Sequence, residues 1–308
     1  MQTSSIAAGV YFSTNRSGNY EIVRLHDGNL EFLTTDATYD SWWPRQSPSG
    51  ETMLFYRSRV SDRPESGGTN NNYDKASLWS LDLKTGTAAE LIPNNSNGWV
   101  AQGVADWSPD GSTLIMAARL NSTGRWHLFT TNSDGSNQTQ ISNRTSLFLD
   151  PSWSPDGSKI VYVAFPPDYP GIDLARLEVY IADANGLNSQ RLTNDNLRDH
   201  DPYWSPDGNT IAFETAVDPL FNAVGRWAIR TASPTGGNPS ILFDDANIST
   251  LPRWNHDGSR ILFHRFIFGS GHGFIVASML ADGSDYQAVT LGGDYDDTDL
   301  DWFRRVPE

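Results

Sequence analysis

A five-residue motif, a tryptophan followed by Ser-Pro-Asp-Gly, recurs along the chain and restricts the folds that it can adopt. Complete copies occupy residues 107–111, 153–157 and 204–208, and degenerate copies occupy 46–50 and 254–258. The glycines at 111, 157, 208 and 258 are spaced by 46, 51 and 50 residues, and the step from Gly50 is longer because a loop is inserted. A period near 50 residues fits one four-stranded sheet with its turns, which predicts a β-propeller.

Strand signals follow each motif in the same order. Short β-branched and aromatic runs at 160–163, 211–213 and 261–263 begin directly after an Asp-Gly turn, as the second strand of a hairpin does. A third strand then ends at another glycine-containing turn, and a fourth strand, as at 191–193, closes the unit. We therefore predict an all-β, six-bladed propeller of four-stranded antiparallel blades, in a single domain over residues 1–308.

The two ends of the chain complement each other in this scheme. Residues 9–34 supply three strands of a blade without a leading tryptophan segment, and the segment 300–303 is a leading segment with no blade after it. We expect the C-terminal strand to pair with the N-terminal blade, which closes the ring and removes two exposed sheet edges.

Composition excludes several classes of function. The 308 residues contain no cysteine, so no disulfide framework, thiol nucleophile or zinc thiolate site is available. The formal net charge of −15 argues against nucleic acid as a partner. No apolar run is long enough to cross a bilayer, so membrane insertion is not expected, and residues 1–5 lack the features of a signal peptide. We expect a monomer.

The repeat resembles that of a known family. The pattern Trp-Ser-Pro-Asp-Gly-x-x-Ile-x-Phe, with Leu-Thr at the end of the fourth strand, looks like the TolB-type β-propeller repeat and covers essentially the whole chain. The resemblance is to the propeller alone, without the α/β domain that precedes it in TolB. Similar repeats occur in peptidase propeller domains and in seven-bladed oligogalacturonate lyases, so the resemblance implies a fold and leaves the activity open. A periplasmic or secreted location is favoured over a cytoplasmic one.

Loop lengths predict where a site would lie. Turns between strands one and two, and three and four, are all tight, whereas the long connections emerge on the opposite face. Long loops on a rigid scaffold usually carry binding groups, so we expect the site on that face, around the central channel.

Aspartates gather before the repeat tryptophans on the long-loop face. Carboxylates that converge on a channel could hold a divalent cation, because Ca²⁺ and Mg²⁺ take oxygen ligands. The alternative is that they cap backbone N–H groups where each strand begins. No organic cofactor is expected. The candidate ligands are Asp150, Asp199, Asp201, Asp297 and Asp299.

Other polar and aromatic residues interrupt the repeat on the same face. A histidine or tyrosine could act as a general base while an arginine holds a substrate carboxylate, as a polysaccharide lyase requires. Polar strand ends that are merely solvated are the alternative. The candidate catalytic residues are His200, His264, Tyr56 and Glu214. The candidate ligand-binding residues are Arg57, Arg265, Arg119, Trp43, Tyr73 and Trp99.

Two functions remain open from the sequence. The leading hypothesis is a binding propeller that captures a carbohydrate, a peptide or another small ligand on the long-loop face, together with a divalent cation or without one. The second is a carbohydrate-active enzyme, a polysaccharide lyase or a glycoside hydrolase, with its site on the same face.

Overall fold

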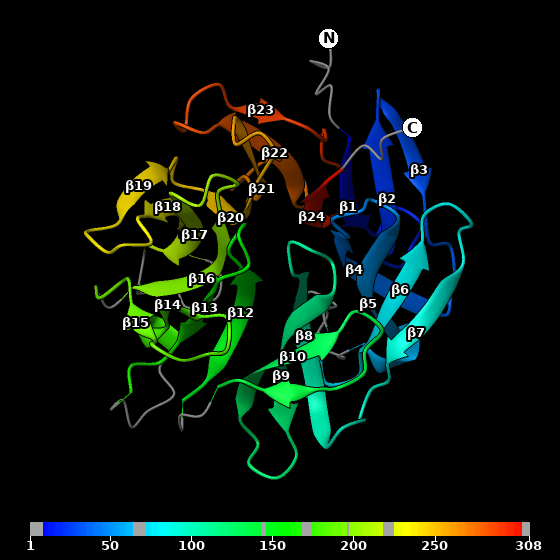
Figure 1. Cartoon of the computed structure of the whole chain (residues 1–308). Helices are drawn as coiled ribbons and strands as arrows, with labels where there is room; N and C mark the ends of the chain where they lie inside the picture. The colour runs from blue at the N-terminus through cyan, green and yellow to red at the C-terminus, as the bar shows by residue number, and fades with distance from the viewer. Residues whose placement is uncertain are drawn as a thin grey trace.

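The chain folds into a ring of antiparallel sheets around a central channel (Figure 1). The structure is a computed structural model that describes residues 9–63, 72–142, 146–167, 174–195, 197–217 and 225–303. Two single-turn 3₁₀ helices, η1 (Val60–Asp62) and η2 (Leu174–Arg176), accompany the strands. Among the described residues, no helix is long and apolar enough to span a membrane.

Among the described residues, the pairings group the strands into four-stranded meanders, which we label units 1 to 6 and whose strands we give in order from the channel outward. Unit 1 contains β24 (Asp297–Trp302), β1 (Val10–Thr14), β2 (Glu21–His26) and β3 (Asn29–Phe32). Unit 2 contains β4 (Tyr39–Gln46), β5 (Thr52–Arg59), β6 (Ser77–Asp82) and β7 (Ala88–Ile92). Unit 3 contains β8 (Trp99–Trp107), β9 (Thr113–Leu120), β10 (Trp126–Asn132) and β11 (Thr139–Gln140).

The remaining units continue around the ring. Unit 4 contains β12 (Phe148–Trp153), β13 (Lys159–Ala164), β14 (Glu178–Asp183) and β15 (Gln190–Arg191). Unit 5 contains β16 (Arg198–Trp204), β17 (Ile211–Ala216), β18 (Trp227–Ala232) and β19 (Ser240–Phe243). Unit 6 contains β20 (Ile248–Trp254), β21 (Arg260–Phe266), β22 (Ile275–Leu280) and β23 (Gln287–Ala288).

Units 5 and 6 belong to one eight-stranded sheet, whereas units 1 to 4 are separate four-stranded sheets. A single parallel pair, Trp227 with Ile248, joins β18 to β20 and makes the two meanders continuous. Every other pairing within this sheet is antiparallel. The all-β propeller that the repeat predicts is therefore confirmed, with one link between neighbouring units that its period does not encode.

The C-terminal strand closes the ring, as the ends of the sequence predict. Strand β24 lies antiparallel to β1, with Val10 opposite Trp302 and Tyr11 opposite Asp301 (Figure 1). The Phe303 N–H extends the pairing by a 2.8 Å bond to the Gly9 carbonyl. Unit 1 is therefore assembled from both ends of the chain, and neither β1 nor β24 leaves an unpaired edge toward the other.

Three of the outermost strands are very short. The expected strand over 191–193 is reduced to β15, which ends at Arg191, and β11 and β23 are equally short. A short outer strand leaves few unpaired N–H and C=O groups at the edge of a unit. Such an edge is a poor template for pairing with another chain.

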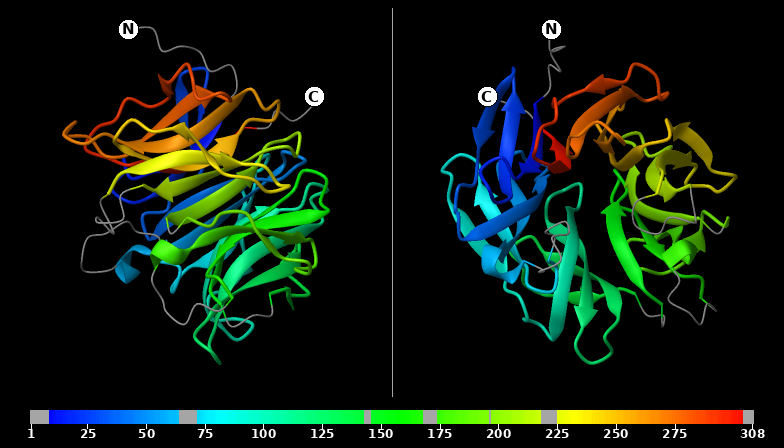
Figure 2. Two further views of the ribbon diagram at one scale, coloured as in Figure 1. Left: turned by 90° about the vertical axis from the view of Figure 1, so that its left-hand side faces the viewer. Right: turned by 180° about the vertical axis from the view of Figure 1, so that it is seen from behind.

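The two ends of the channel differ in their loops, as expected. At one end the turn between the first and second strands hydrogen-bonds to the turn between the third and fourth, as from the Ser133 N–H to the Ser112 carbonyl at 3.0 Å and from the Ala184 N–H to the Ser158 carbonyl at 3.0 Å. We call this the tight-turn end. The opposite, long-loop end carries the other connections of each unit (Figure 2).

Proline and glycine of the repeated motif lock neighbouring units together at the tight-turn end. A Cβ placed on Gly157 would lie 3.7 Å from the Pro109 ring of the preceding unit, and one on Gly208 would lie 3.5 Å from the Pro155 ring. Each of these glycines also has a positive φ, which a β-hairpin turn needs and which side chains disfavour. The motif thus serves both its own turn and the packing of the next unit.

We expect Trp302→Ala to destabilise the whole ring. The indole is 2% exposed and its Nε1 donates a 2.9 Å hydrogen bond to the Arg253 carbonyl of unit 6. Truncating a buried tryptophan costs about 3–5 kcal/mol, and here it also weakens the closing sheet. Urea denaturation followed by near-UV circular dichroism measures the loss. Leu291→Ala is the control, because Leu291 is 78% exposed and a surface change of this kind costs within about 0.5 kcal/mol.

Candidate functional site

A bulge recurs in the innermost strand of every unit and shapes the channel wall. The pairing register between first and second strands shifts at this point in all six units. One residue of each bulge has a positive φ, which is uncommon for any residue other than glycine and for which Asp is favoured over Val or Leu. These residues are Trp43, Val104, Asp150, Asp201, Leu251 and Asp299. The three aspartates that the sequence places before the repeat tryptophans thus occupy bulges within the strands, not the points where the strands begin.

Two arginines and two aspartates stand among the six residues that lie two positions after the positive-φ residues of the bulges. Arg45 donates a 2.9 Å hydrogen bond to the Leu300 carbonyl, and its guanidinium lies 4.1 Å from the Trp43 ring. Arg253 lies over Tyr203 at 4.7 Å. Burial and the charge of Arg253 lower the pKa of Arg45. The six residues are Arg45, Asp106, Ser152, Tyr203, Arg253 and Asp301.

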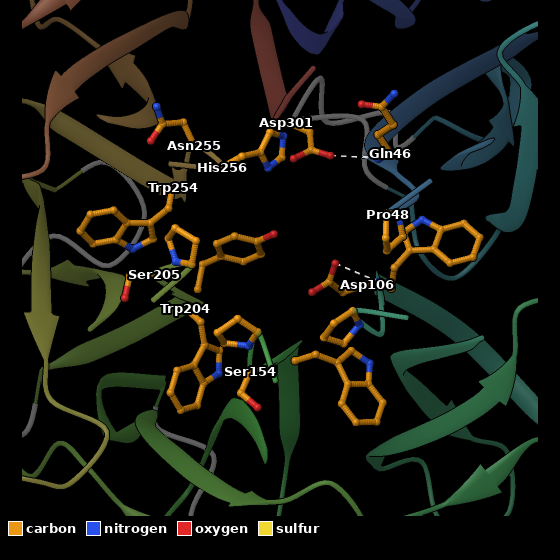
Figure 3. Close-up of a pocket in the computed structure, with 16 residues that line it drawn as sticks. Gln46, Pro48, Asp106, Ser154, Trp204, Ser205, Trp254, Asn255, His256 and Asp301 are labelled. Atoms are coloured by element: carbon orange, nitrogen blue, oxygen red, sulfur yellow. Dashed lines mark hydrogen bonds between the residues drawn. The ribbon is translucent and has the colours of Figure 1, made fainter. Parts of the chain in front are cut away.

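A funnel of about 360 Å³ opens at the tight-turn end of the channel (Figure 3). Asp106 and Asp301 lie on its wall, and the repeat tryptophans and prolines surround them. Arg45 and Arg253 do not line the funnel, since they face a small cavity further along the channel with Asp150 and Asp201. The funnel residues are Gln46, Pro48, Asp106, Trp107, Pro109, Trp153, Ser154, Pro155, Tyr203, Trp204, Ser205, Pro206, Trp254, Asn255, His256 and Asp301.

Both funnel carboxylates are held in place by hydrogen bonds. Asp106 accepts from the Ser152 hydroxyl at 3.0 Å and from the Trp107 N–H at 3.0 Å. Asp301 accepts from the Gln46 N–H at 2.9 Å and from the Trp302 N–H at 2.9 Å. Burial raises the pKa of Asp106 above its usual value, and the nearby Arg45 offsets part of that rise. The two side chains are therefore fixed acceptors within the funnel.

The turn aspartates carry their negative charge down to low pH at the tight-turn end. Asp110 accepts from the Ser108 hydroxyl at 2.6 Å and from the Ser112 N–H at 3.0 Å. These bonds lower the pKa of Asp110 to about 2, and the same arrangement lowers the pKa of Asp156 to about 2. Hydrogen bonds within the turns also lower the pKa of further aspartates at this end: Asp82, Asp134, Asp207, Asp257 and Asp282. The motif aspartates are turn residues, as predicted, and they also charge this end of the channel.

The Tyr73 side chain lies close to Gly103 and to the bulge aspartates Asp299 and Asp201. A Cβ on Gly103 would meet the Tyr73 ring at 2.8 Å, so only glycine leaves room for it there. The ring lies edge-on to Tyr56 at 5.6 Å. Burial raises the pKa of Tyr73, and the carboxylates of Asp299 and Asp201 raise it further. The predicted ligand-binding residue Tyr73 thus reaches the bulge aspartates from the insertion in unit 2.

His200 is the centre of a hydrogen-bonded network at this end. Its Nδ1 lies 2.7 Å from Asp150 Oδ2, and Arg198 Nε donates to its Nε2 at 2.9 Å. Because arginine can only donate, Nε2 is the acceptor and Nδ1 carries the proton. Glu214 accepts from the Leu251 N–H at 2.6 Å, and burial raises the pKa of Glu214.

The structure places the other two predicted catalytic residues in buried positions. His264 is 6% exposed, and its Nε2 has no hydrogen-bond partner among the described residues. Burial, with Arg253 and Arg45, lowers the pKa of His264 to about 3, so it is a weak base. Tyr56 is fully buried, and burial raises its pKa. A catalytic role for either residue remains a prediction.

The predicted ligand-binding arginines contact other residues of the protein. Arg57 donates a 3.2 Å bond to the Ser41 hydroxyl and lies 4.9 Å from the Trp79 ring. Arg119 pairs with Asp74 at 2.9 Å, and Arg265 pairs with Asp245. Binding of a ligand there would have to displace these contacts.

Two of the three aromatic residues predicted to bind ligand, Trp43 and Trp99, are buried. Trp43 is 4% and Trp99 is 3% exposed. Trp99 lies against Phe129 at 4.7 Å, and Trp43 lies under Arg45 and Arg253. Both side chains belong to the same hydrophobic core cluster. Sequence position alone could not reveal this burial.

The five predicted metal ligands do not converge on one point. Asp150 binds His200, and Asp297 accepts bonds from Thr14 and Arg16. Burial and the charge of Asp150 raise the pKa of Asp201. Among the five, and within the part of the chain that the structure describes, Asp199 alone takes part in a group of carboxylates with suitable spacing. With Glu178 and Asp195 it forms a triad whose ligand oxygens lie within 4.8 Å of one another, so this triad could hold a metal ion.

Comparison with known proteins agrees with the repeat pattern. No family model matches the chain. The Tol-Pal system protein TolB of Anaeromyxobacter dehalogenans is 28% identical over 143 residues, which span 46% of this chain and 30% of that protein. A structure from Agrobacterium tumefaciens assigned to TolB superposes with a TM-score of 0.67 at 17% identity, over 98% of this chain and 100% of the other.

This chain is a TolB-like β-propeller. It spans about a third of the length of the curated relatives that it matches. The oligogalacturonate lyase of Vibrio parahaemolyticus superposes on the TolB-like chain with a TM-score of 0.59 at 14% identity, over 90% of this chain and 73% of the lyase. Likeness at this identity shows the fold alone.

We expect His264 to make the TolB-like propeller less stable in acid. The folded state keeps His264 neutral down to a pKa of about 3, whereas the unfolded chain protonates it near pH 6.5. Its contribution is therefore fully present above about pH 6.5 and is lost as the pH falls toward 3, by at most about 1.4 kcal/mol per pH unit.

Urea denaturation at pH 7.5, 6.5, 5.5 and 4.5 tests this expectation. His264→Gln should flatten the decline in the free energy of unfolding, whereas His272→Gln, at an exposed position, should leave the decline unchanged. Parallel declines in His264→Gln and the unmutated protein would contradict it, because they would mean that His264 takes up its proton equally readily in the folded and unfolded states.

Proposed function

We propose that the propeller is a binding module that captures a basic segment of another protein at its tight-turn end, with one lysine or arginine side chain in the funnel. The observation that carries the proposal is the funnel itself, which Asp106 and Asp301 line together with Tyr203 and four tryptophans. Carboxylates pair with a cationic head group, and tryptophan and tyrosine faces attract it as well.

The charge around the funnel supports a cationic ligand. Aspartates of the turns are ionised at neutral pH, and hydrogen bonds within the turns lower their pKa values further, so they stay ionised in mild acid. Like charges at one end of a channel focus the potential and accelerate the approach of an oppositely charged partner. The net charge of −15 acts in the same direction.

The size and position of the funnel favour a side chain over a large ligand. A volume of about 360 Å³ lies at the lower end of the range of small-molecule pockets. At the other end of the channel the Tyr73 ring packs against Gly103, and Arg119 and Arg265 are paired within the protein. We accordingly place the ligand at the tight-turn end instead of the long-loop face that the sequence favours.

We take the six units as six blades of a single domain. The eight-stranded sheet counts as two blades, because one parallel pair is all that joins β18 to β20. The expected divalent cation has no part in the funnel on this proposal. The acidic triad between units 4 and 5 suits it better.

We expect Asp106→Asn and Asp301→Asn each to weaken binding of a lysine-containing peptide about tenfold, which corresponds to about 1.4 kcal/mol. The neutral amide keeps the shape of the side chain and removes its charge. Quenching of the funnel tryptophans during titration with the peptide measures the affinity, at 50 and 200 mM NaCl. Binding should weaken at the higher salt concentration because surface charges are screened.

Two controls separate this mode of binding from others. Asp74→Asn removes a carboxylate at the long-loop end and should leave the affinity unchanged. A peptide with glutamine in place of lysine should bind much more weakly. Equal affinity for the two peptides, or binding of a neutral saccharide that Asp106→Asn does not affect, would contradict a cationic ligand.

A second function is favoured by the hydrogen-bonded histidine at the long-loop end. Asp150 fixes the tautomer of His200, and Arg198 lies beside it, which is an arrangement that a lyase or glycosidase could use for proton transfer. If so, His200→Ala should abolish turnover of an acidic oligosaccharide, measured by formation of unsaturated or reducing ends, while His272→Ala retains it. No turnover by the unmutated protein across a saccharide panel would leave binding as the function.

A further inference from the structure

Arg198 differs from five other arginines at the long-loop end in the residue that holds it. It is the first residue of β16, the innermost strand of unit 5. Its Nε donates a 2.9 Å hydrogen bond to Nε2 of His200, which is an imidazole and not a carboxylate. The five arginines that pair with a carboxylate are Arg16, Arg63, Arg119, Arg226 and Arg265.

The imidazole fixes Arg198 without cancelling its charge. Nε2 of His200 accepts the bond from Arg198, and Nδ1 carries the proton of the ring toward Asp150 at 2.7 Å, so the ring is neutral. The guanidinium also lies 5.4 Å from the centre of the Trp227 ring, within the range of a cation–π attraction. These two contacts orient the guanidinium and leave its positive charge available.

The two terminal nitrogens of Arg198 are open to a ligand. Among the described residues, neither Nη1 nor Nη2 has a hydrogen-bond acceptor, and neither is enclosed by the protein, so both reach solvent. An arginine presents these N–H groups in parallel, in a geometry that matches the two oxygens of a carboxylate. The free side of Arg198 therefore suits a carboxylate group.

Two buried acids lie near Arg198, but each of them binds another donor. Asp150 Oδ2 is the partner of His200, and Glu214 accepts from the Leu251 N–H at 2.6 Å. Burial lowers the pKa of Arg198, and the charges of Glu214 and Asp150 offset only part of that effect. A partly buried guanidinium gains more from a bound anion than an exposed one does, because solvent screens the attraction less.

We propose that Arg198 binds the carboxylate of a small-molecule ligand at the long-loop end of unit 5, with Nη1 and Nη2 each donating to one carboxylate oxygen. The half-buried Trp227 lies beside the guanidinium, and tryptophan surfaces pack against flat rings. The ligand is therefore a sugar or an aromatic ring that carries a carboxylate.

This site is separate from the funnel, which neither Arg198 nor Trp227 lines. Binding there requires no proton transfer by His200. If the second function holds, Arg198 is the residue that would position the acidic group of its substrate.

Ligand-observed NMR at pH 7.5 tests the site, with glucuronate and benzoate as the acidic probes and glucose and benzamide as their neutral counterparts. We expect at least one acid to bind, and its neutral counterpart to bind about tenfold more weakly or less. Raising the NaCl concentration should weaken binding of the acid because the charges are screened. Binding of glucuronate alone would support a sugar acid as the ligand, and binding of benzoate alone an aromatic acid.

Variants of Arg198 test which group holds the acid. Arg198→Gln removes the charge and should weaken binding of the acid about tenfold or more. Arg198→Lys keeps the charge but not the two parallel N–H groups, so it should recover only part of the affinity. Arg226→Gln is the matched control, because Arg226 adjoins Trp227 in the sequence and already pairs with Asp244 at 3.0 Å. It should bind the acid as the unmutated protein does.

Three results would overturn the proposal: no binding of either acid to the unmutated protein, equal binding of an acid and its neutral counterpart, or full affinity in Arg198→Gln. Near-UV circular dichroism shows whether each variant is folded. If Arg198→Gln does not fold, full affinity in Arg198→Lys overturns the paired hydrogen bonds instead. Binding of glucuronate without turnover of any oligosaccharide would support this site and contradict the second function.

Discussion

Closure of the ring by β24 and β1 is the constraint on which the rest of the molecule depends. The channel exists only while six innermost strands face one another, and unit 1 obtains its innermost strand from the opposite end of the chain. Trp302 also links unit 1 to unit 6, since its indole Nε1 donates a hydrogen bond to the Arg253 carbonyl. The funnel carboxylate Asp301 lies next to it on the same strand, so the geometry of the funnel and the closure of the ring are set by the same residues.

Charge is distributed differently at the two ends of the channel. At the long-loop end, acids pair with arginines, within unit 1 for Arg16 with Asp297 and between neighbouring units for Arg119 with Asp74 and Arg265 with Asp245. At the tight-turn end, the turn aspartates are bonded to serine hydroxyls and backbone N–H groups, which satisfy their hydrogen bonds without cancelling their charge. Pairing fixes loops to the scaffold, whereas unpaired charge acts on molecules in solution. This contrast is the physical reason for placing the proposed ligand at the short turns.

Local chemistry explains what could be predicted from the sequence. Asp-Gly turns and the runs after them depend on neighbouring residues only, so the strands and the closure followed from the repeat. The bulges did not, because Val104 and Leu251 have no preference for a positive φ and adopt it under the packing of the channel.

The position of the Tyr73 ring depends on its contact with Gly103, and the burial of Trp99 depends on its contact with Phe129. Both contacts join segments that are distant in the sequence. The recurrence of proline and tryptophan was the available signal for the funnel. A residue repeated once in every unit must form a ring around the axis.

The locking of proline against glycine is incomplete around the ring. It runs from Pro48 on Gly111 through successive units to Pro206 on Gly258, where unit 6 has His256 in place of the proline. Unit 1 has no turn between its first two strands, because β24 and β1 come from opposite ends of the chain. The ring therefore has a seam at unit 1, between β24 and β1. Hydrogen bonds join these two strands, and no turn connects them. Thermal motion that widens the channel should begin at this seam, and the other units would follow as one linked arc.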